Sequence, residues 1–328
     1  MTNIIFYNGL DIAEESIHVF NAYNKNENDS NNTMRESIIS GIINNKIPEE
    51  NYKNKLWKNM KTEINIYLYE LKKKLYIEEK ANIICIPKGG RRHHYDFLLI
   101  FDKKTEVKIE FKFNASKVDE CPQFVSPGKP SKFMDKNYEE WFYENGLKKI
   151  AEYGNLELPD KTVFVKTIHN NKVEVMKLYK KKYDTDINFR NYCKKIDKLT
   201  NKQFLIESKL NITIMSDYLF ETQQNKRFMC YNPNDGKFSD DTLDKSLFEL
   251  EDVCEIKSPN IICKTKKGYK LEIKLRWKNG NGIQYPAFQI SRKIPTKSEL
   301  IEICHINKIE INKKNKKQII LNTLNDNK

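Results

Sequence analysis

The chain has few of the residues that mark metal-binding or exported modules. It contains only 5 histidines and 7 cysteines. No two cysteines form a C-x-x-C pair, and none has a histidine at ligand spacing, which argues against a zinc module and for reduced thiols in an intracellular compartment. The N-terminal stretch has no basic start followed by an apolar core, and no window approaches about 18 apolar residues. We therefore expect a soluble, intracellular protein without a membrane segment.

Acidic charge is also scarce relative to basic charge. The 58 basic and 45 acidic residues give a net charge of +13, spread along the chain. Such a charge favours a polyanionic partner, with nucleic acid ahead of a membrane surface. An AT-rich coding sequence would also enrich lysine and asparagine without any function. Neither a G-x-S-x-G elbow nor a G-x-x-x-x-G-K-[ST] loop occurs, so acyl transfer and ATP-driven translocation have no support.

The distribution of apolar residues predicts the elements of the first half. Residues 25–34 have almost no apolar side chain and predict an exposed loop. From Leu56 to Leu75 apolar residues recur every three or four positions, as in an amphipathic helix. A short strand over 81–87 follows, and "YDFLLIF" and "EVKIEFKF" around the polar turn "DKKT" predict a β-hairpin. Residues 137–154 predict a helix that Gly154 ends.

The second half has a different pattern. Residues 180–210 are rich in lysine and predict helix, and we place a domain boundary there, between a domain of residues 1–195 and one of residues 196–328. From about Asn211 to Ser291 the pattern is mostly that of strands. It includes a second hairpin, "NIICKTKKGYKLEIKLRW", followed by an Asn-Gly turn signal. The expected fold is α/β with a β-rich C-terminal half.

The first hairpin brings acidic residues together. A turn centred on residues 103 and 104 sets Asp96 opposite Phe111 and within one residue of Glu110. Lys112 follows two positions later on the same strand face. Two carboxylates this close repel one another unless a cation lies between them, and their oxygens suit Mg²⁺. A divalent ion held in this way can orient a water and stabilise charge on a phosphate, which points to phosphodiester hydrolysis.

Here the chain resembles the PD-(D/E)xK nuclease superfamily, which has the restriction-endonuclease-like fold. The resemblance lies in Asp96 of "HHYDF", followed after thirteen residues by "EFK", with Tyr95 in place of the family's proline. It implies a mixed central sheet flanked by helices, in the order α-β-β-β-α-β, over roughly residues 50–170. It also implies that Asp96, Glu110 and the Phe111 carbonyl hold the metal, while Lys112 assists the attacking water.

The family's preceding helix often adds an acid near the metal. Glu63 and Glu70 both border the apolar stripe of the 56–75 helix, and Glu63 is the preferred candidate. The second hairpin also has an E-x-K, at Glu272, but its expected cross-strand partner is Ile262 and no acid is in reach. That hairpin therefore lacks the partner carboxylate.

Basic and aromatic residues outside the motif are candidates for nucleic-acid binding. Basic side chains can contact phosphates, glutamine can pair with adenine, and an aromatic ring can stack on an exposed base. The alternative for these residues is a solvated loop or a structural sheet edge. The candidates are Arg91, Arg92, Lys274, Arg276, Lys278, Gln284 and Tyr285.

These features predict a Mg²⁺-dependent endonuclease of the restriction type that acts on DNA and often works as a homodimer, since cutting two strands calls for two sites. Two alternatives stay open. One is a non-catalytic nucleic-acid-binding protein on a nuclease-like fold, and the other is an RNA-directed nuclease.

Overall fold

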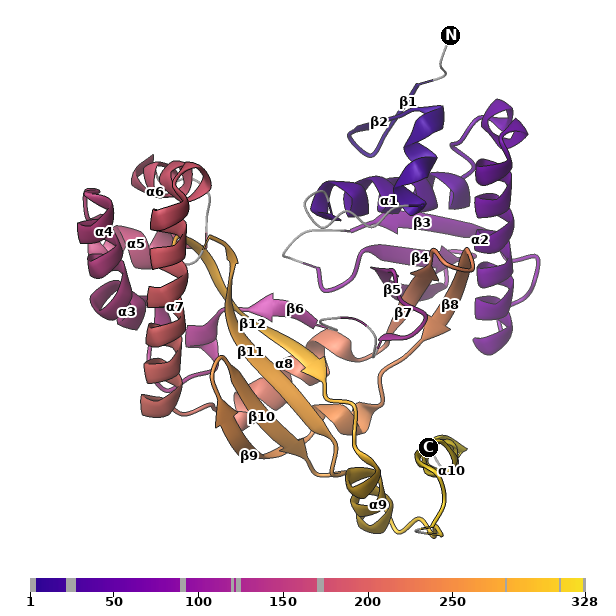
Figure 1. Ribbon diagram of the computed structural model, residues 1–328. Helices are drawn as coiled ribbons and strands as arrows, with labels where there is room; N and C mark the ends of the chain where they lie inside the picture. Colours follow the sequence, from indigo (N-terminus) through magenta and orange to yellow (C-terminus); the bar gives the residue numbers. More distant parts are fainter. Residues whose placement is uncertain are drawn as a thin grey trace. The chain divides into compact units, whose positions relative to one another are not determined.

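The chain divides into two compact units. The computed structural model describes residues 4–21, 28–88, 93–118, 121, 125–169, 174–280, 282–312 and 314–326. The first unit comprises Met1–Pro122 and Thr222–Leu243, and the second comprises Gln123–Glu221 and Asp244–Lys328. Each unit has its own five-stranded sheet (Figure 1). The chain is therefore mixed α/β, as the sequence predicted.

A mixed sheet forms the centre of the first unit. Its strands lie in the order β3-β4-β5-β7-β8, and only the β5–β7 pair is parallel. Two long helices and a small hairpin, β1–β2, accompany it. The elements are β1 (Ile5–Tyr7), β2 (Leu10–Ile12), α1 (Asn28–Ile43), α2 (Lys55–Lys74), β3 (Ile83–Pro87), β4 (Phe97–Phe101), β5 (Thr105–Phe113), β7 (Lys226–Asn232) and β8 (Lys237–Asp241).

The core of the first unit lies between these helices and one sheet face. Trp57 and Ile64 on α2 are fully buried, as the three-to-four spacing predicted, and Asn54 caps the helix by accepting the Leu56 N–H at 2.9 Å. Ile109 on β5 belongs to the same core cluster. Because side chains alternate along a strand, burial of the odd-numbered residues of β5 leaves Glu110 and Lys112 on the other face.

The second unit holds an antiparallel sheet and most of the helices. Its strands lie in the order β6-β12-β11-β10-β9. The strands are β6 (Val125–Gly128), β9 (Leu250–Lys257), β10 (Asn260–Thr265), β11 (Lys270–Asn279) and β12 (Gln284–Arg292). The helices are α3 (Tyr138–Phe142), α4 (Lys148–Gly154), α5 (Lys161–Thr167), α6 (Glu174–Thr185), α7 (Ile187–Glu207), α8 (Ile212–Gln223), α9 (Lys297–Ile306) and α10 (Lys317–Asp326).

Three expectations from the sequence differ from this arrangement. The structure divides the chain at 122/123, 221/222 and 243/244, not at 195/196, so the helix predicted over 137–154 belongs to the second unit. Residues 28–34, expected in a loop, form the start of α1. Residues 212–223, expected among strands, form α8. By contrast, the second hairpin pairs Ile262 with Glu272 as predicted. None of the helices in the described ranges is long and apolar enough to cross a membrane.

Candidate active site

The β4–β5 hairpin sets Asp96 across from Glu110. Phe97 pairs with Ile109. Asp96, which precedes Phe97, therefore lies across from Glu110, which follows Ile109. The Asp96 N–H donates to the Ile109 carbonyl at 2.9 Å. Its Oδ2 accepts the Phe111 N–H at 2.8 Å. The side chain of Asp96 thus takes the place of a strand partner just before β4 begins, which fixes its carboxylate beside Glu110.

This register differs by one residue from the prediction, which placed Asp96 opposite Phe111. Phe101 pairs with Thr105, so the turn has three residues instead of two. Asp102 and Lys103 in it have φ of 47° and 59°, a left-handed conformation that a three-residue hairpin turn uses. The three-residue turn brings Asp96 close enough to Glu110 for the two charges to interact.

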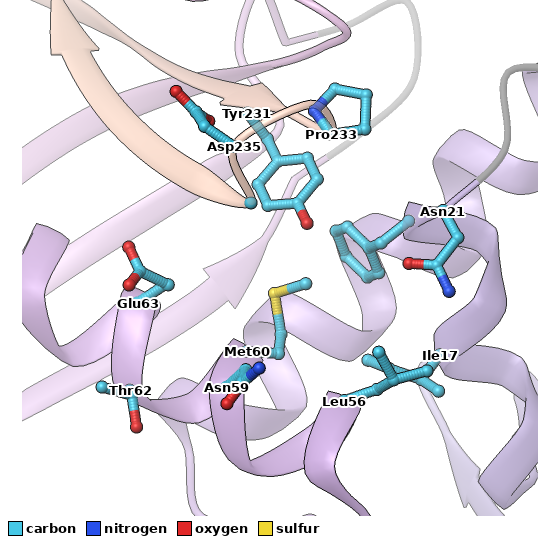
Figure 2. A pocket seen from close by; sticks show the side chains of 12 residues that line it. Ile17, Asn21, Leu56, Asn59, Met60, Thr62, Glu63, Tyr231, Pro233 and Asp235 are labelled. Carbon is cyan, nitrogen blue, oxygen red and sulfur yellow. The ribbon is translucent and has the colours of Figure 1, made fainter.

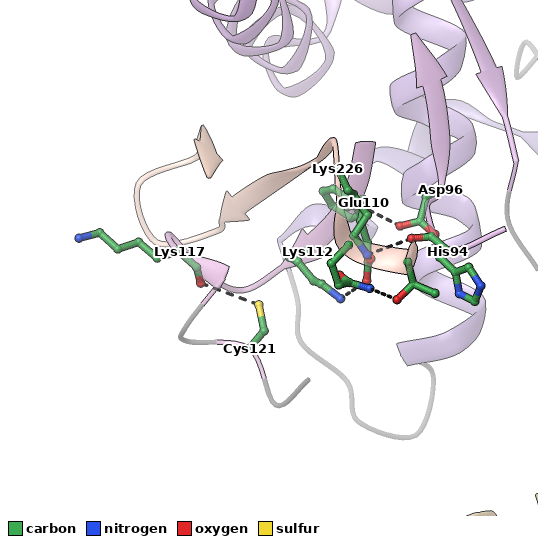
Figure 3. Close-up of polar contacts among 10 residues, drawn as sticks. His94, Asp96, Glu110, Lys112, Lys117, Cys121 and Lys226 are labelled. Carbon is green, nitrogen blue, oxygen red and sulfur yellow. Dashed lines mark hydrogen bonds and ion pairs between the residues drawn. The ribbon is translucent and has the colours of Figure 1, made fainter. Parts of the chain in front are cut away.

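Glu110 lies between two lysines (Figure 3). Its Oε1 accepts a hydrogen bond from Lys112, as the E-x-K spacing suggested, and its Oε2 accepts one from Lys226. Only 1% of the Lys226 side chain is exposed, and its Nζ also donates to the His94 carbonyl at 3.0 Å. Sequence analysis missed Lys226 because it lies 116 residues after Glu110 and reaches it only through the parallel β5–β7 pair.

Burial and mutual repulsion set the protonation of the acidic residues. Burial and the charge of Glu110 raise the pKa of Asp96 to about 6. Burial raises the pKa of Glu110 as well, but the ammonium groups of Lys112 and Lys226 outweigh it and hold that pKa below its ordinary value. Asp96 is therefore the member of the pair that takes up a proton first.

A third carboxylate from α1 interacts with this pair. Burial, together with repulsion from Asp96 and Glu110, raises the pKa of Glu36 to about 8. The expected helical acid was Glu63, and the structure corrects this choice. We call Glu36, Asp96, Glu110, Lys112 and Lys226 the carboxylate–lysine cluster. Little in the sequence pointed to Glu36, because this residue comes shortly after residues 25–34, which were expected to form a loop.

Glu63 faces a different part of the first unit. It lines a pocket of about 380 Å³ together with Phe20, Met60, Tyr231 and Asp235 (Figure 2). The Tyr231 ring packs edge-on against the Phe20 ring, with 5.2 Å between the two ring centroids. Since side chains alternate along β7, Tyr231 points away from the sheet face that carries Lys226. Glu63 thus lies in this pocket beside Tyr231, and not at the carboxylate–lysine cluster.

Three expected site residues of the first unit remain: Phe111, Arg91 and Arg92. The Phe111 side chain is 6% exposed and belongs to the hydrophobic core, while its N–H anchors Asp96. A role for its carbonyl in holding a metal stays a prediction. Arg91 and Arg92 lie outside the described residues.

The expected nucleic-acid contacts of the second unit lie on β11 and β12. Lys274 and Lys278 are exposed. Arg276 is half-buried, and its Nη1 donates to Gln289 Oε1 at 2.9 Å. Gln284 is half-buried. Tyr285 is 8% exposed, so its ring is buried in this structure, and stacking of this ring on a base stays a prediction.

The oxygen ligands of the cluster suit a hard cation, but their present contacts compete with one. Carboxylates are ligands that Mg²⁺ prefers, and two of the three have raised pKa values that a nearby cation would lower. Both oxygens of Glu110, however, bond to lysines. Accordingly, over the residues the structure describes, no group of three or more His, Cys, Asp or Glu side chains is arranged to hold a metal ion. A cation at Glu110 would have to share these oxygens with the two ammonium groups or replace one of them.

Comparison with known proteins gives no further guide. No protein-family model matches the chain, and no curated protein or solved structure does so.

Proposed function

We propose that this protein is a divalent-cation-dependent endonuclease that hydrolyses phosphodiester bonds of DNA, built on a PD-(D/E)xK-like core. The observation that supports it best is the meeting of Asp96 and Glu110 across neighbouring strands, with Lys112 bonded to Glu110. This is the constellation that the sequence motif implies. The first unit also has the order of helix, three antiparallel strands and a parallel fourth strand that suits such a core.

Each residue has a distinct role in this proposal. Asp96, Glu110 and Glu36 would hold the cation, with Mg²⁺ the expected ion because all their ligand atoms are oxygens. When bound, the cation would supply charge stabilisation at the phosphate. Lys112, whose side chain is 13% exposed, would place an ammonium group beside the scissile bond, where it can stabilise negative charge or orient a water.

A non-catalytic nucleic-acid-binding protein is the second candidate. The bonds from Lys112 and Lys226 to Glu110 favour it, because an ammonium group at each oxygen of this carboxylate already neutralises its charge and repels an incoming cation. In that case the cluster is structural, and the basic surfaces alone carry the function.

Cleavage of a supercoiled plasmid with Mg²⁺, and again with EDTA, separates the two candidates. We expect nicked and linear products only with Mg²⁺. The Lys112→Ala variant should bind DNA as the wild type does and lose cleavage, by about a hundredfold or more. Cleavage that persists at the wild-type rate in this variant contradicts the assignment. Preference for single-stranded RNA over duplex DNA would instead support an RNA-directed nuclease.

A further inference from the structure

The positive charge of the chain is concentrated in one unit. The first unit contains 22 basic and 21 acidic residues, and the second contains 36 basic and 24 acidic residues. The second unit therefore carries almost the whole net charge of +13. A lysine-rich composition without function predicts no such division between the two units. A strongly basic unit joined to a near-neutral one is the charge footprint of a polyanion-binding surface.

One face of α7 presents a row of lysines to solvent. Lys194, Lys198 and Lys202 are spaced by four residues, so they lie on one side of the helix about 6 Å apart along its axis. Lys195 lies beside them. All four are exposed, and within the part of the chain that the structure describes none of the four forms an ion pair. We call these four residues the α7 lysine row.

The opposite face of α7 holds the helix in place. Phe189, Cys193, Ile196 and Phe204 are buried there, and α7 lies beside α6 and α4 (Figure 1). Like charges four residues apart destabilise a helix by a few tenths of a kcal/mol per pair, so the row brings α7 no stability. From Lys194 to Lys202 the only acid is Asp197, which is half-buried and bonds to Asn201 at 2.7 Å. The exposed positions of this stretch therefore carry the four lysines and Leu199, and no acidic residue.

We infer that the α7 lysine row binds the phosphate backbone of nucleic acid. The inference rests on the proposed function for the choice of polyanion, and it adds a contact surface that the hairpin residues Lys274 and Lys278 do not provide. Lysines contact phosphates as point charges and do not read base sequence. The row should therefore contribute affinity and salt dependence, and no sequence preference.

A triple variant, Lys194→Ala with Lys198→Ala and Lys202→Ala, tests this surface. Alanine is the best helix former, so α7 should persist, which circular dichroism can verify. We measure binding to a duplex DNA in EDTA over a range of salt concentrations, so that cleavage plays no part. The slope of log affinity against log salt should fall in magnitude by about 2.7, or roughly 0.9 per lost phosphate contact. The control variant, Lys53→Ala with Lys55→Ala and Lys58→Ala, removes three exposed lysines from the first unit and should change the slope little.

The outcomes separate this inference from the nuclease proposal. An unchanged slope in the α7 variant, or equal losses in both triple variants, overturns the inference. So does binding of the wild type to anionic phospholipid vesicles that the α7 variant loses, with DNA binding unaffected. If the α7 variant loses DNA affinity as expected while the wild type never cuts the plasmid with Mg²⁺, the inference stands and the nuclease proposal fails.

Discussion

Replacing Lys226 by methionine tests whether its ammonium group occupies the position that a divalent cation needs. The side chain is 1% exposed and bonds to Glu110 Oε2 and to the His94 carbonyl. Methionine keeps a similar length and apolar stem but removes the charge. Breaking a buried ion pair costs about 3–5 kcal/mol. Because Glu110 keeps its bond to Lys112, we expect the free energy of unfolding to fall by about 3 kcal/mol, the lower end of that range.

Mg²⁺ should reverse part of this loss. A ligand that binds only the folded state raises the free energy of unfolding in proportion to the logarithm of its concentration over its dissociation constant. In the wild type the cation competes with the Lys226 ammonium group for Glu110, and in the variant this competition is absent. We therefore expect the apparent Mg²⁺ affinity of Lys226→Met to rise at least about tenfold, equivalent to ~1.4 kcal/mol of additional stabilisation. Urea denaturation with and without Mg²⁺, at a pH above the Asp96 pKa of about 6, measures both effects.

A surface ion pair supplies the control. Lys61 bonds to Glu49 at 3.0 Å, with the two side chains 31% and 82% exposed. Exposed pairs contribute about 0–1 kcal/mol, so Lys61→Met should change stability little and leave the Mg²⁺ response as in the wild type. If Lys226→Met is as stable as the wild type, or if Mg²⁺ stabilises Lys226→Met and the wild type equally, the Lys226 ammonium group does not occupy the position that a divalent cation needs.

Three further predictions concern protonation and packing. Cation binding should strengthen between about pH 6 and pH 8 as the cluster loses protons, and Glu36→Gln, which removes the group with a pKa of about 8, should flatten the upper part of this rise in a calorimetric titration. Burial raises the pKa of Asp197 to about 7, so the folded state holds a proton that the unfolded state releases. Stability should therefore fall from about pH 4 to pH 7, by at most about 4 kcal/mol, and an equally steep fall in Asp197→Asn would contradict this cause. A Cβ at Gly282, where φ is +80°, would lie 2.7 Å from the Phe142 ring, so Gly282→Ala should lower stability by about 1–3 kcal/mol. Gly9→Ala, at a similar φ with nothing within 4 Å, should lose less in thermal denaturation.

Local patterns predicted helix α2 and the β4–β5 hairpin. Helix α2 follows its apolar periodicity closely, since it places one face on a core. Strand β4 is instead buried on both faces, as its continuous apolar run allows. Helix α1 was not predicted, because its first turns consist of asparagine, aspartate and serine, which are typical of loops. Missing α1 also meant missing Glu36. The error in the helical acid thus came from an error in secondary structure, not from the chemistry expected of the site.

The division into units could not be predicted from local patterns. Strands β7 and β8 belong to the sheet of the first unit, yet the 99 residues of Gln123–Glu221 separate them from the rest of it. The hydrogen-bonding edge of β5 gives no sequence signal for which later strand will pair with it. Lys226 is the clearest consequence, since it reaches Glu110 through that non-local pair.

The charges of the carboxylate–lysine cluster argue for a functional role over a structural one. A structural ion pair needs only Glu110 and one lysine, and an apolar pair of similar volume would often be as stable. Instead, Asp96 and Glu36 add two further carboxylates whose raised pKa values report unfavourable burial and repulsion. Groups that lower stability and shift one another's pKa in this way are typical of sites that bind a charged ligand. The cluster balances its negative charge with protons and with two ammonium groups, and a divalent cation could replace the protons and the charge of Lys226. Binding of such a cation at Glu110, against the charge of Lys226, is therefore the step on which the nuclease proposal depends.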